Sequence, residues 1–172
     1  MHDIADLVSE LPPPRTPVNA PSDAEVEKVE EKYGIKFPDD FKDFMKVYGS
    51  GIIYDTFIIF NVGSPDYVSE IDLSSGFYIN HANNWPKEYH LKLWPQAPGI
   101  FPMGRSTQGH TLFWLVTVSG EISGFVIFDP KSPTYMYYEY LFTIFISHCI
   151  SGDFSYIHGG FPSSSEPFKP VG

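Results

Sequence analysis

The chain has 172 residues, of which 42% are hydrophobic and 17% aromatic, so it can bury the core of one globular domain and does not have the composition of a disordered chain. It carries 21 acidic side chains against 11 basic ones, a formal net charge of −10, and no cluster of lysine or arginine. This balance argues against direct binding to nucleic acid or to an anionic membrane.

Several features predict a soluble cytoplasmic protein. Cys149 is the single cysteine, so no internal disulfide can form. The N-terminal residues lack the basic and apolar regions of a signal peptide. The richest apolar stretch, residues 135–150, is too short to span a bilayer.

The N-terminal third predicts an arm followed by two helices. Residues 1–21 include three consecutive prolines and are expected to form an arm rather than a packed element. Ser22 and Glu25 have the spacing of a capping box, which predicts a helix that ends at Gly34. The glutamates of this helix, Glu30 among them, are expected to face solvent.

The second helix is predicted from Pro38 to the glycines Gly49 and Gly51, because Phe41, Phe44, Met45 and Tyr48 follow one another at helical spacing. Three aspartates near its start could resemble a metal or acid–base cluster. Acidic side chains also favour the positive end of a helix dipole, and this is the preferred interpretation, so no metal site is predicted. The three are Asp39, Asp40 and Asp43.

The middle of the chain is harder to interpret. Residues 52–60 favour β-structure, residues 66–75 are expected to be a polar loop, and residues 76–99 are left unassigned except for a short helix within 86–93. Residues 111–118 then predict a strand with apolar side chains on both faces, as expected for an interior strand covered on both sides.

The last third predicts a partner strand over residues 125–128 and a closing helix over 139–150. The inward-facing positions of this helix are expected to be Leu141, Ile144, Phe145 and Cys149. The domain is therefore predicted to span residues 22–152, and residues 153–172 are expected to be a tail rich in serine, proline and glycine.

The stretch GRSTQGHT, residues 104–111, nearly matches the phosphate-binding loop G-x-x-x-x-G-K-[ST]. Its context does not, because a strand rather than a helix is predicted after it and His110 occupies the place of the lysine. We therefore interpret it as a turn between two strands. Ser106 and His110 could suggest a hydrolase, but no nucleophile elbow accompanies them, and no catalytic residue or cofactor is predicted.

The order of these segments resembles the SUKH superfamily of bacterial immunity proteins and fungal cell-wall regulators. The resemblance covers residues 22–150 and combines the FPDDFKDFMKVYGSG helix, the GIFPMGRSTQGHTLFWL strand pair and the FVIFD strand. Family members often have acidic residues where this chain has His110 and Leu115. The residues that carry the motifs are Pro38, Gly49, Gly51, Pro102, Gly104, Gly109 and Trp114.

The resemblance implies an α+β fold, a single domain with a mainly antiparallel sheet flanked by helices, and no catalysis. It implies a protein partner, most simply a basic toxin domain such as a nuclease, which an acidic immunity protein could neutralise. The alternative is a regulatory or scaffold module that binds an endogenous protein.

For the contact surface we expect exposed acids and aromatic residues of the variable middle of the chain, because interfaces often combine aromatic anchors with a polar rim. Arg105 is expected to order its own turn or to pair with a nearby acid. The predicted contact residues are Asp55, Asp66, Tyr67, Glu70, Asp72, Trp85, Glu88 and Tyr89.

Overall fold

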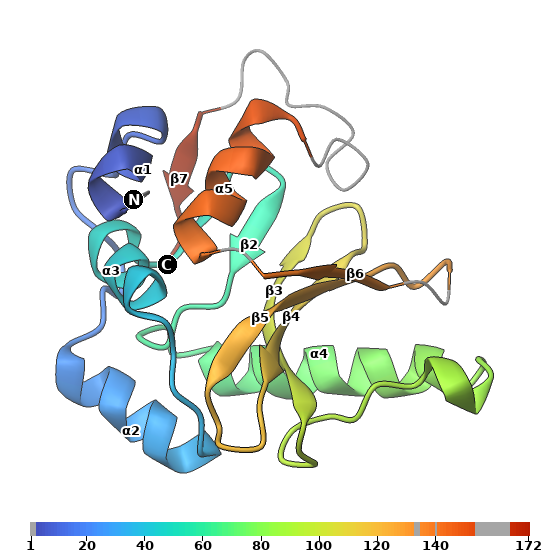
Figure 1. The fold of residues 1–172 in the computed structure, drawn as a ribbon. Coiled ribbons are helices and arrows are strands. Elements are labelled where there is room, and N and C mark those ends of the chain that lie inside the picture. Colours follow the sequence, from blue (N-terminus) through green and yellow to red (C-terminus); the bar gives the residue numbers. More distant parts are fainter. Residues whose placement is uncertain (1–2, 133–134, 140, 154–165) are drawn as a thin grey trace.

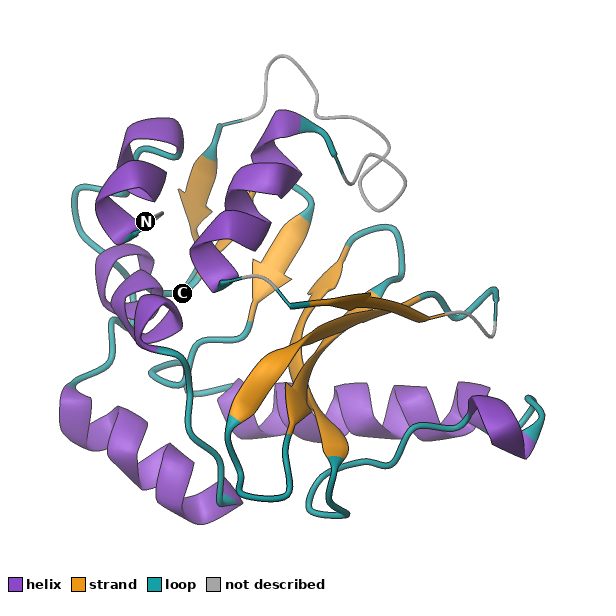
Figure 2. Cartoon of the chain, in the orientation of Figure 1, coloured by secondary structure: helices purple, strands orange, loops and turns teal. Residues whose placement is uncertain are grey.

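A computed structural model describes residues 3–132, 135–139, 141–153 and 166–172 of the chain. Within these residues, seven strands form one antiparallel sheet in the order β6-β5-β4-β3-β2-β1-β7. Helices pack on both faces of the sheet (Figures 1 and 2). The prediction of an α+β fold with a mainly antiparallel sheet flanked by helices is confirmed.

The helices are α1 (Ile4–Glu10), α2 (Asp23–Tyr33), α3 (Asp39–Tyr48), α4 (Tyr67–Ala82), the 3-10 turn η1 (Lys87–Tyr89) and α5 (Phe142–Ser151). The strands are β1 (Gly51–Ile53), β2 (Phe57–Ile59), β3 (Gly99–Ser106), β4 (Thr111–Val116), β5 (Ile122–Phe128), β6 (Tyr135–Tyr138) and β7 (Phe168–Pro170).

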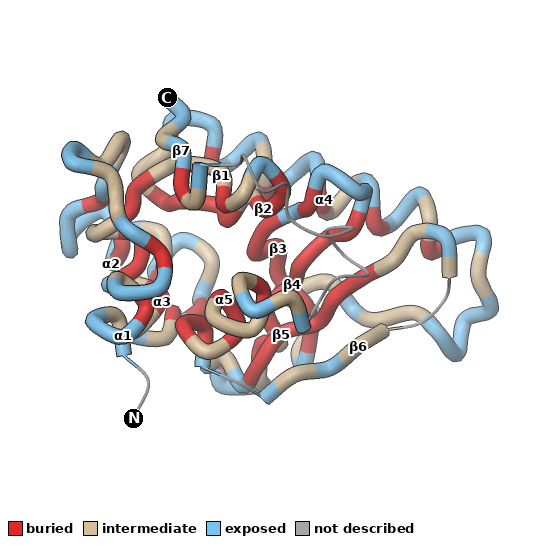
Figure 3. Tube along the Cα trace, turned by 90° about the horizontal axis from the view of Figure 1, so that it is seen from above, coloured by how far each residue is buried: buried red, intermediate tan, exposed pale blue. Residues whose placement is uncertain are grey.

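Helix α3 places its aromatic side chains at the centre of the main core. Phe41 packs edge-on against both Trp114 of β4 and Phe142 of α5, with ring centroids 5.0 Å apart in each pair. Phe44 also meets Phe142 and stacks on Tyr48 at 4.7 Å. The predicted apolar face of this helix is confirmed, and it joins the sheet to α5 (Figure 3).

The N-terminal residues do not form the expected unpacked arm. Asp3 and Asp6 form a capping box that starts α1, and Leu7 and Leu11 are fully buried against α3 and α5. The hydroxyl of Tyr48 donates a hydrogen bond of 2.6 Å to the carbonyl of Leu11. The helix was not predicted because the three prolines made the whole of residues 1–21 look like an arm. The prolines follow α1 and do not interrupt it.

Helix α2 begins with the predicted capping box of Ser22 and Glu25, but the expectation that Glu30 faces solvent is wrong. Glu30 is 3% exposed. Its carboxylate accepts hydrogen bonds from Lys36 Nζ at 2.9 Å and from the Phe37 N–H at 2.8 Å, and it lies 3.0 Å from Lys42 Nζ. Burial opposes ionisation of this group, but the two lysines and the N–H outweigh it and lower the Glu30 pKa.

The predicted turn between two strands is confirmed, because residues 107–110 connect β3 to β4. Gly109 has a φ of +92°, which few other residues adopt, and any side chain at Gly104 would meet the Ile58 carbonyl, 2.5 Å from the Cβ position. A strand rather than a helix follows the turn, so no phosphate-binding loop forms.

Helix α4 replaces the polar loop expected at residues 66–75. It lies across the sheet face opposite α3 and α5 (Figure 1). Tyr78 and Ala82 pack there with Ile100, Phe113 and Phe128 in a second core cluster. The prediction that β4 is covered on both faces is thereby confirmed.

At the C-terminal end, α5 begins three residues later than predicted and buries partly different side chains. Phe145 and Cys149 are buried as expected, whereas Leu141 is 47% exposed and Phe142 takes its place in the core. Asp40 of α3 accepts a hydrogen bond of 2.9 Å from the Thr143 N–H, so it caps α5 from another helix.

The expected tail is only partly described. Residues 154–165 lie outside the described part of the chain, but residues 168–170 form β7, which pairs with β1, and Phe168 is buried against Tyr48.

Replacing Tyr48 by phenylalanine is expected to loosen α1. The change leaves the buried Leu11 carbonyl without its hydrogen bond, which should lower the free energy of unfolding by about 1–2 kcal/mol. Urea unfolding measures the loss, and faster amide exchange at Leu11 would locate it. Exchange that speeds up equally in α4 would contradict the assignment to α1.

Replacing Glu30 by glutamine should destabilise the protein by about 2 kcal/mol at neutral pH, because Lys42 loses a buried anionic partner. The folded pKa of Glu30 lies below its ordinary value of 4.5, so its contribution is complete above that value and is lost as the pH falls through the folded pKa. The difference in unfolding free energy between the wild type and Glu30→Gln, measured by urea unfolding, should be smaller at about pH 3 than at pH 7. The exposed Glu27→Gln is the matched control, and an equal loss there would contradict the role of Glu30.

Candidate functional site

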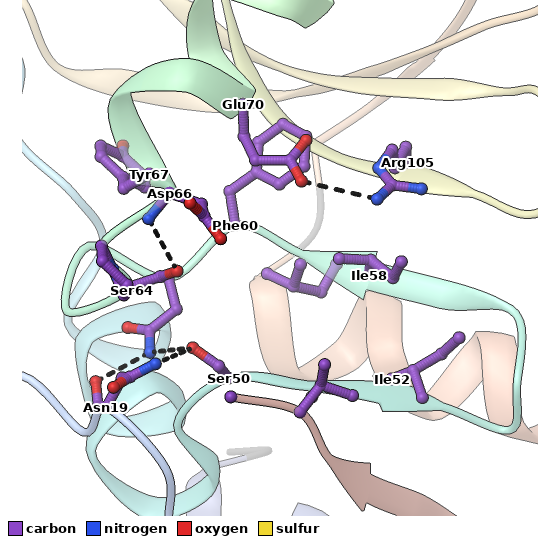
Figure 4. A pocket seen from close by; sticks show the side chains of 16 residues that line it. Asn19, Ser50, Ile52, Ile58, Phe60, Ser64, Asp66, Tyr67, Glu70 and Arg105 are labelled. Carbon is purple, nitrogen blue, oxygen red and sulfur yellow. Dashed lines mark hydrogen bonds and ion pairs between the residues drawn. The ribbon is translucent and has the colours of Figure 1, made fainter.

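A pocket of about 270 Å³ lies beside the start of α4 (Figure 4). It is on the same face of the sheet as α4, over strands that the helix does not cover. Ile52 of β1 and Ile58 of β2 are cross-strand neighbours that line it, and Arg105 of β3 follows in the same row. Lys169 of β7 pairs with Ile52 at the other end of that row. The lining thus combines an apolar floor with one cation, Arg105, whereas Lys169 stands in the same row outside the lining.

The deepest polar group of the pocket is already used in the fold. Asn61 is 4% exposed, and its amide Nδ2 donates to the carbonyl of Asn19 at 2.9 Å and to the hydroxyl of Ser50 at 3.0 Å. Its Oδ1 accepts from the Gly63 N–H at 3.2 Å. Asn61 therefore ties three segments together, and specificity for a ligand would have to come from the rim.

Acidic side chains at the start of α4 form that rim. Asp66 and Glu70 are four residues apart and so lie on the same side of the helix. Glu70 Oε1 lies 3.5 Å from Arg105 Nη2, which joins α4 to β3. Because both side chains are partly exposed, such a pair contributes at most about 1 kcal/mol and can exchange partners at low cost.

A second, wider hollow of about 1050 Å³ continues on the other side of this ion pair, between α4 and the β3–β4 turn. We call it the α4 groove; Glu70 and Arg105 line it as well as the pocket. Asp72, Leu73 and Phe77 of α4 form one wall. The two hollows are thus neighbouring parts of one surface.

Ser106 and His110 do not form a nucleophile and base. Ser106 Oγ lies 3.4 Å from His110 Nδ1, beyond the usual reach of such a pair, and it accepts a hydrogen bond from the His110 N–H at 3.2 Å. Both side chains are buried, and burial lowers the His110 pKa although Asp129, 4.0 Å from Nε2, opposes this. These contacts fasten the β3–β4 turn.

The structure brings together three of the predicted contact acids. Asp66 and Glu70 line the pocket, and Glu70 and Asp72 line the α4 groove. The expectation that Arg105 pairs with a nearby acid is confirmed by Glu70. The apolar side chains Leu73 and Phe77 were missed, because this segment was interpreted as a loop and no helical face was assigned to it.

The other predicted contact residues lie elsewhere. Tyr67 is buried at the start of α4, where burial raises its hydroxyl pKa, so the expectation that it is exposed is wrong. Trp85 packs 5.1 Å from the ring of Phe128, in the second core cluster. Asp55 lies in the β1–β2 turn, and Glu88 and Tyr89 lie in η1, so these three line neither hollow.

Two further searches of the described residues bear on the site. They contain no group of three or more histidine, cysteine, aspartate or glutamate residues that could hold a metal ion. None of their helices combines the length and apolar character needed to cross a bilayer.

Comparison with known proteins identifies the family. The model of the SMI1 / KNR4 family (SUKH-1) matches residues 20–147, which include every element from α2 to β6. No curated protein and no solved structure shows a significant similarity to the chain. The SUKH family includes toxin-immunity proteins and regulators, and SUKH proteins bind protein partners. Because this match covers most of its length, the chain belongs to the SMI1 / KNR4 (SUKH-1) family.

Proposed function

We propose that this protein is a non-enzymatic immunity protein that binds and neutralises the toxin domain of a contact-dependent or polymorphic toxin system. The observation that carries the proposal is the α4 face of this SUKH-1 protein, where Asp66, Glu70 and Asp72 border two adjoining hollows. Such a surface suits a protein partner that offers basic and apolar side chains.

A nuclease domain is the proposed target, for an electrostatic reason. A nuclease must present cations to phosphates, and a protein with a net charge of −10 can occupy that surface in place of nucleic acid. Opposite charges also raise the association rate, which favours capture of the toxin before it acts. We further infer a cytoplasmic location, because a nuclease would meet its nucleic acid there.

The second candidate is a regulatory or scaffold module that binds an endogenous protein, since the family also includes regulators. The same surface would serve that role. A toxin gene beside the gene for this protein would favour the immunity role, and its absence would favour the regulatory one.

The test is whether this protein captures the C-terminal domain of the protein that the neighbouring gene encodes. Binding at low salt that weakens at high salt, together with rescue of cells that express that domain, is the expected outcome. Absence of both binding and rescue would overturn the immunity role for that pair and move the case toward a regulator.

Charge reversal should then locate the contact. The double variant Asp66→Lys/Asp72→Lys leaves the Glu70–Arg105 pair intact and should weaken capture about tenfold or more at low salt. The matched control is Glu27→Lys/Glu31→Lys, which changes the net charge equally on the exposed side of α2. Titration calorimetry measures both, and an equal loss in the control would show that net charge rather than the α4 face is responsible.

A further inference from the structure

Helix α4 exposes large apolar side chains, although Phe77 also meets the edge of the buried Phe128 ring at 6.4 Å. Leu73 is 69% exposed and Phe77, one turn later, is 37% exposed. The sheet-facing side of the same helix is already packed through Ile71, Tyr78 and Ala82. Adjacent exposed apolar side chains beside a hollow are a feature of interaction sites.

Gly76 also lines the α4 groove and adds no side chain beside these two. It lies in the middle of α4, and apart from its chain neighbours and the backbone of the helix a Cβ placed there would have no atom within 4 Å. Glycine is unfavourable inside a helix by roughly 1 kcal/mol relative to alanine, and packing does not require it at this position. The missing side chain therefore leaves room over the wall formed by Leu73 and Phe77.

The charges that line the α4 groove favour a basic occupant. Its two carboxylates belong to Glu70 and Asp72, and Arg105 already pairs with Glu70, which leaves Asp72 uncompensated. His110 also lines the groove, and burial lowers its pKa and so disfavours the cationic form. A second copy of this chain would bring the same carboxylates and a net charge of −10 to an acidic surface, which opposes self-association.

We propose that the α4 groove receives a segment of the protein partner in which an apolar side chain is flanked by lysine or arginine. The apolar side chain packs on Leu73 and Phe77 beside Gly76, and a flanking cation faces Asp72. This inference rests on the proposed function in one respect, since it takes the ligand to be a protein, but it names the subsite and the chemistry that the subsite recognises.

Fluorescence anisotropy with a labelled 14-residue peptide of leucine and lysine at helical spacing tests the proposal on the full chain. Two matched peptides are the controls. One has glutamate in place of lysine, and the other has serine in place of leucine. Only the leucine–lysine peptide should bind. Equal binding of the lysine–serine peptide would show attraction by net charge alone and would overturn the proposal.

The decisive variant is Gly76→Gln, which fills the α4 groove without adding charge and should keep or raise the melting temperature, because glutamine favours a helix more than glycine does. We expect its Kd for the peptide to rise about tenfold or more, as for Leu73→Ser. Val118→Gln, at an exposed position outside the groove, is the control and should bind like the wild type. Unchanged binding by Gly76→Gln would overturn the proposal.

The same variants separate this proposal from the immunity role. A toxin domain captured equally by wild type and Gly76→Gln would leave the immunity role standing and overturn the assignment of the α4 groove. Peptide binding that depends on Gly76, without capture of any toxin, would support the groove and remove the immunity role. Light scattering that shows a wild-type dimer and a Gly76→Gln monomer would identify a second copy as the occupant and overturn the proposal.

Discussion

The aromatic face of α3 is the contact on which the rest of the fold depends. Phe41 contacts both Trp114 of the central sheet and Phe142 of α5, so one side chain of α3 joins three elements of the main core. Tyr48, at the other end of the helix, holds Leu11 through its hydroxyl and Phe168 through its ring. Both terminal segments are thereby attached to the same helix.

Strong local signals predicted the elements nearest this helix. Each of these signals lies within a short stretch of sequence: the capping box of α2, the apolar spacing of α3 and the two-sided pattern of β4. The structure contains all three. Glu30 was misplaced because its partners Lys36 and Lys42 lie beyond the helix, where helical spacing gives no information. The burial of α1 was missed for the same reason, since its partners lie in α3 and α5.

The candidate site was predicted in part only. Three of the acids that line it are among the residues predicted to contact a partner, but the helix that aligns them was taken for a loop because serines and a glycine interrupt it. The buried residues of α4 repeat at intervals of three and four residues, which is a helical signal: Tyr67, Ile71, Ser74, Tyr78 and Ala82. The signal was weak because Ser74 is small and polar and Ala82 is small. The proximity of Arg105 to Glu70 depends on tertiary packing, which no local pattern encodes.

The pairing of β1 with β7 has a consequence for the order in which the protein becomes complete during synthesis. Gly51 pairs with Pro170, and Val171 and Gly172 help to line the pocket beside α4. The strands from β1 to β6 can associate while the chain is still being made, because all of them precede β7 in the sequence. One edge of β1 can pair with β2 early, but its other edge must wait for β7, and closing the long loop between β1 and β7 costs chain entropy. The pocket is therefore finished last, and a ribosome-bound chain would present the α4 groove before it presents the pocket.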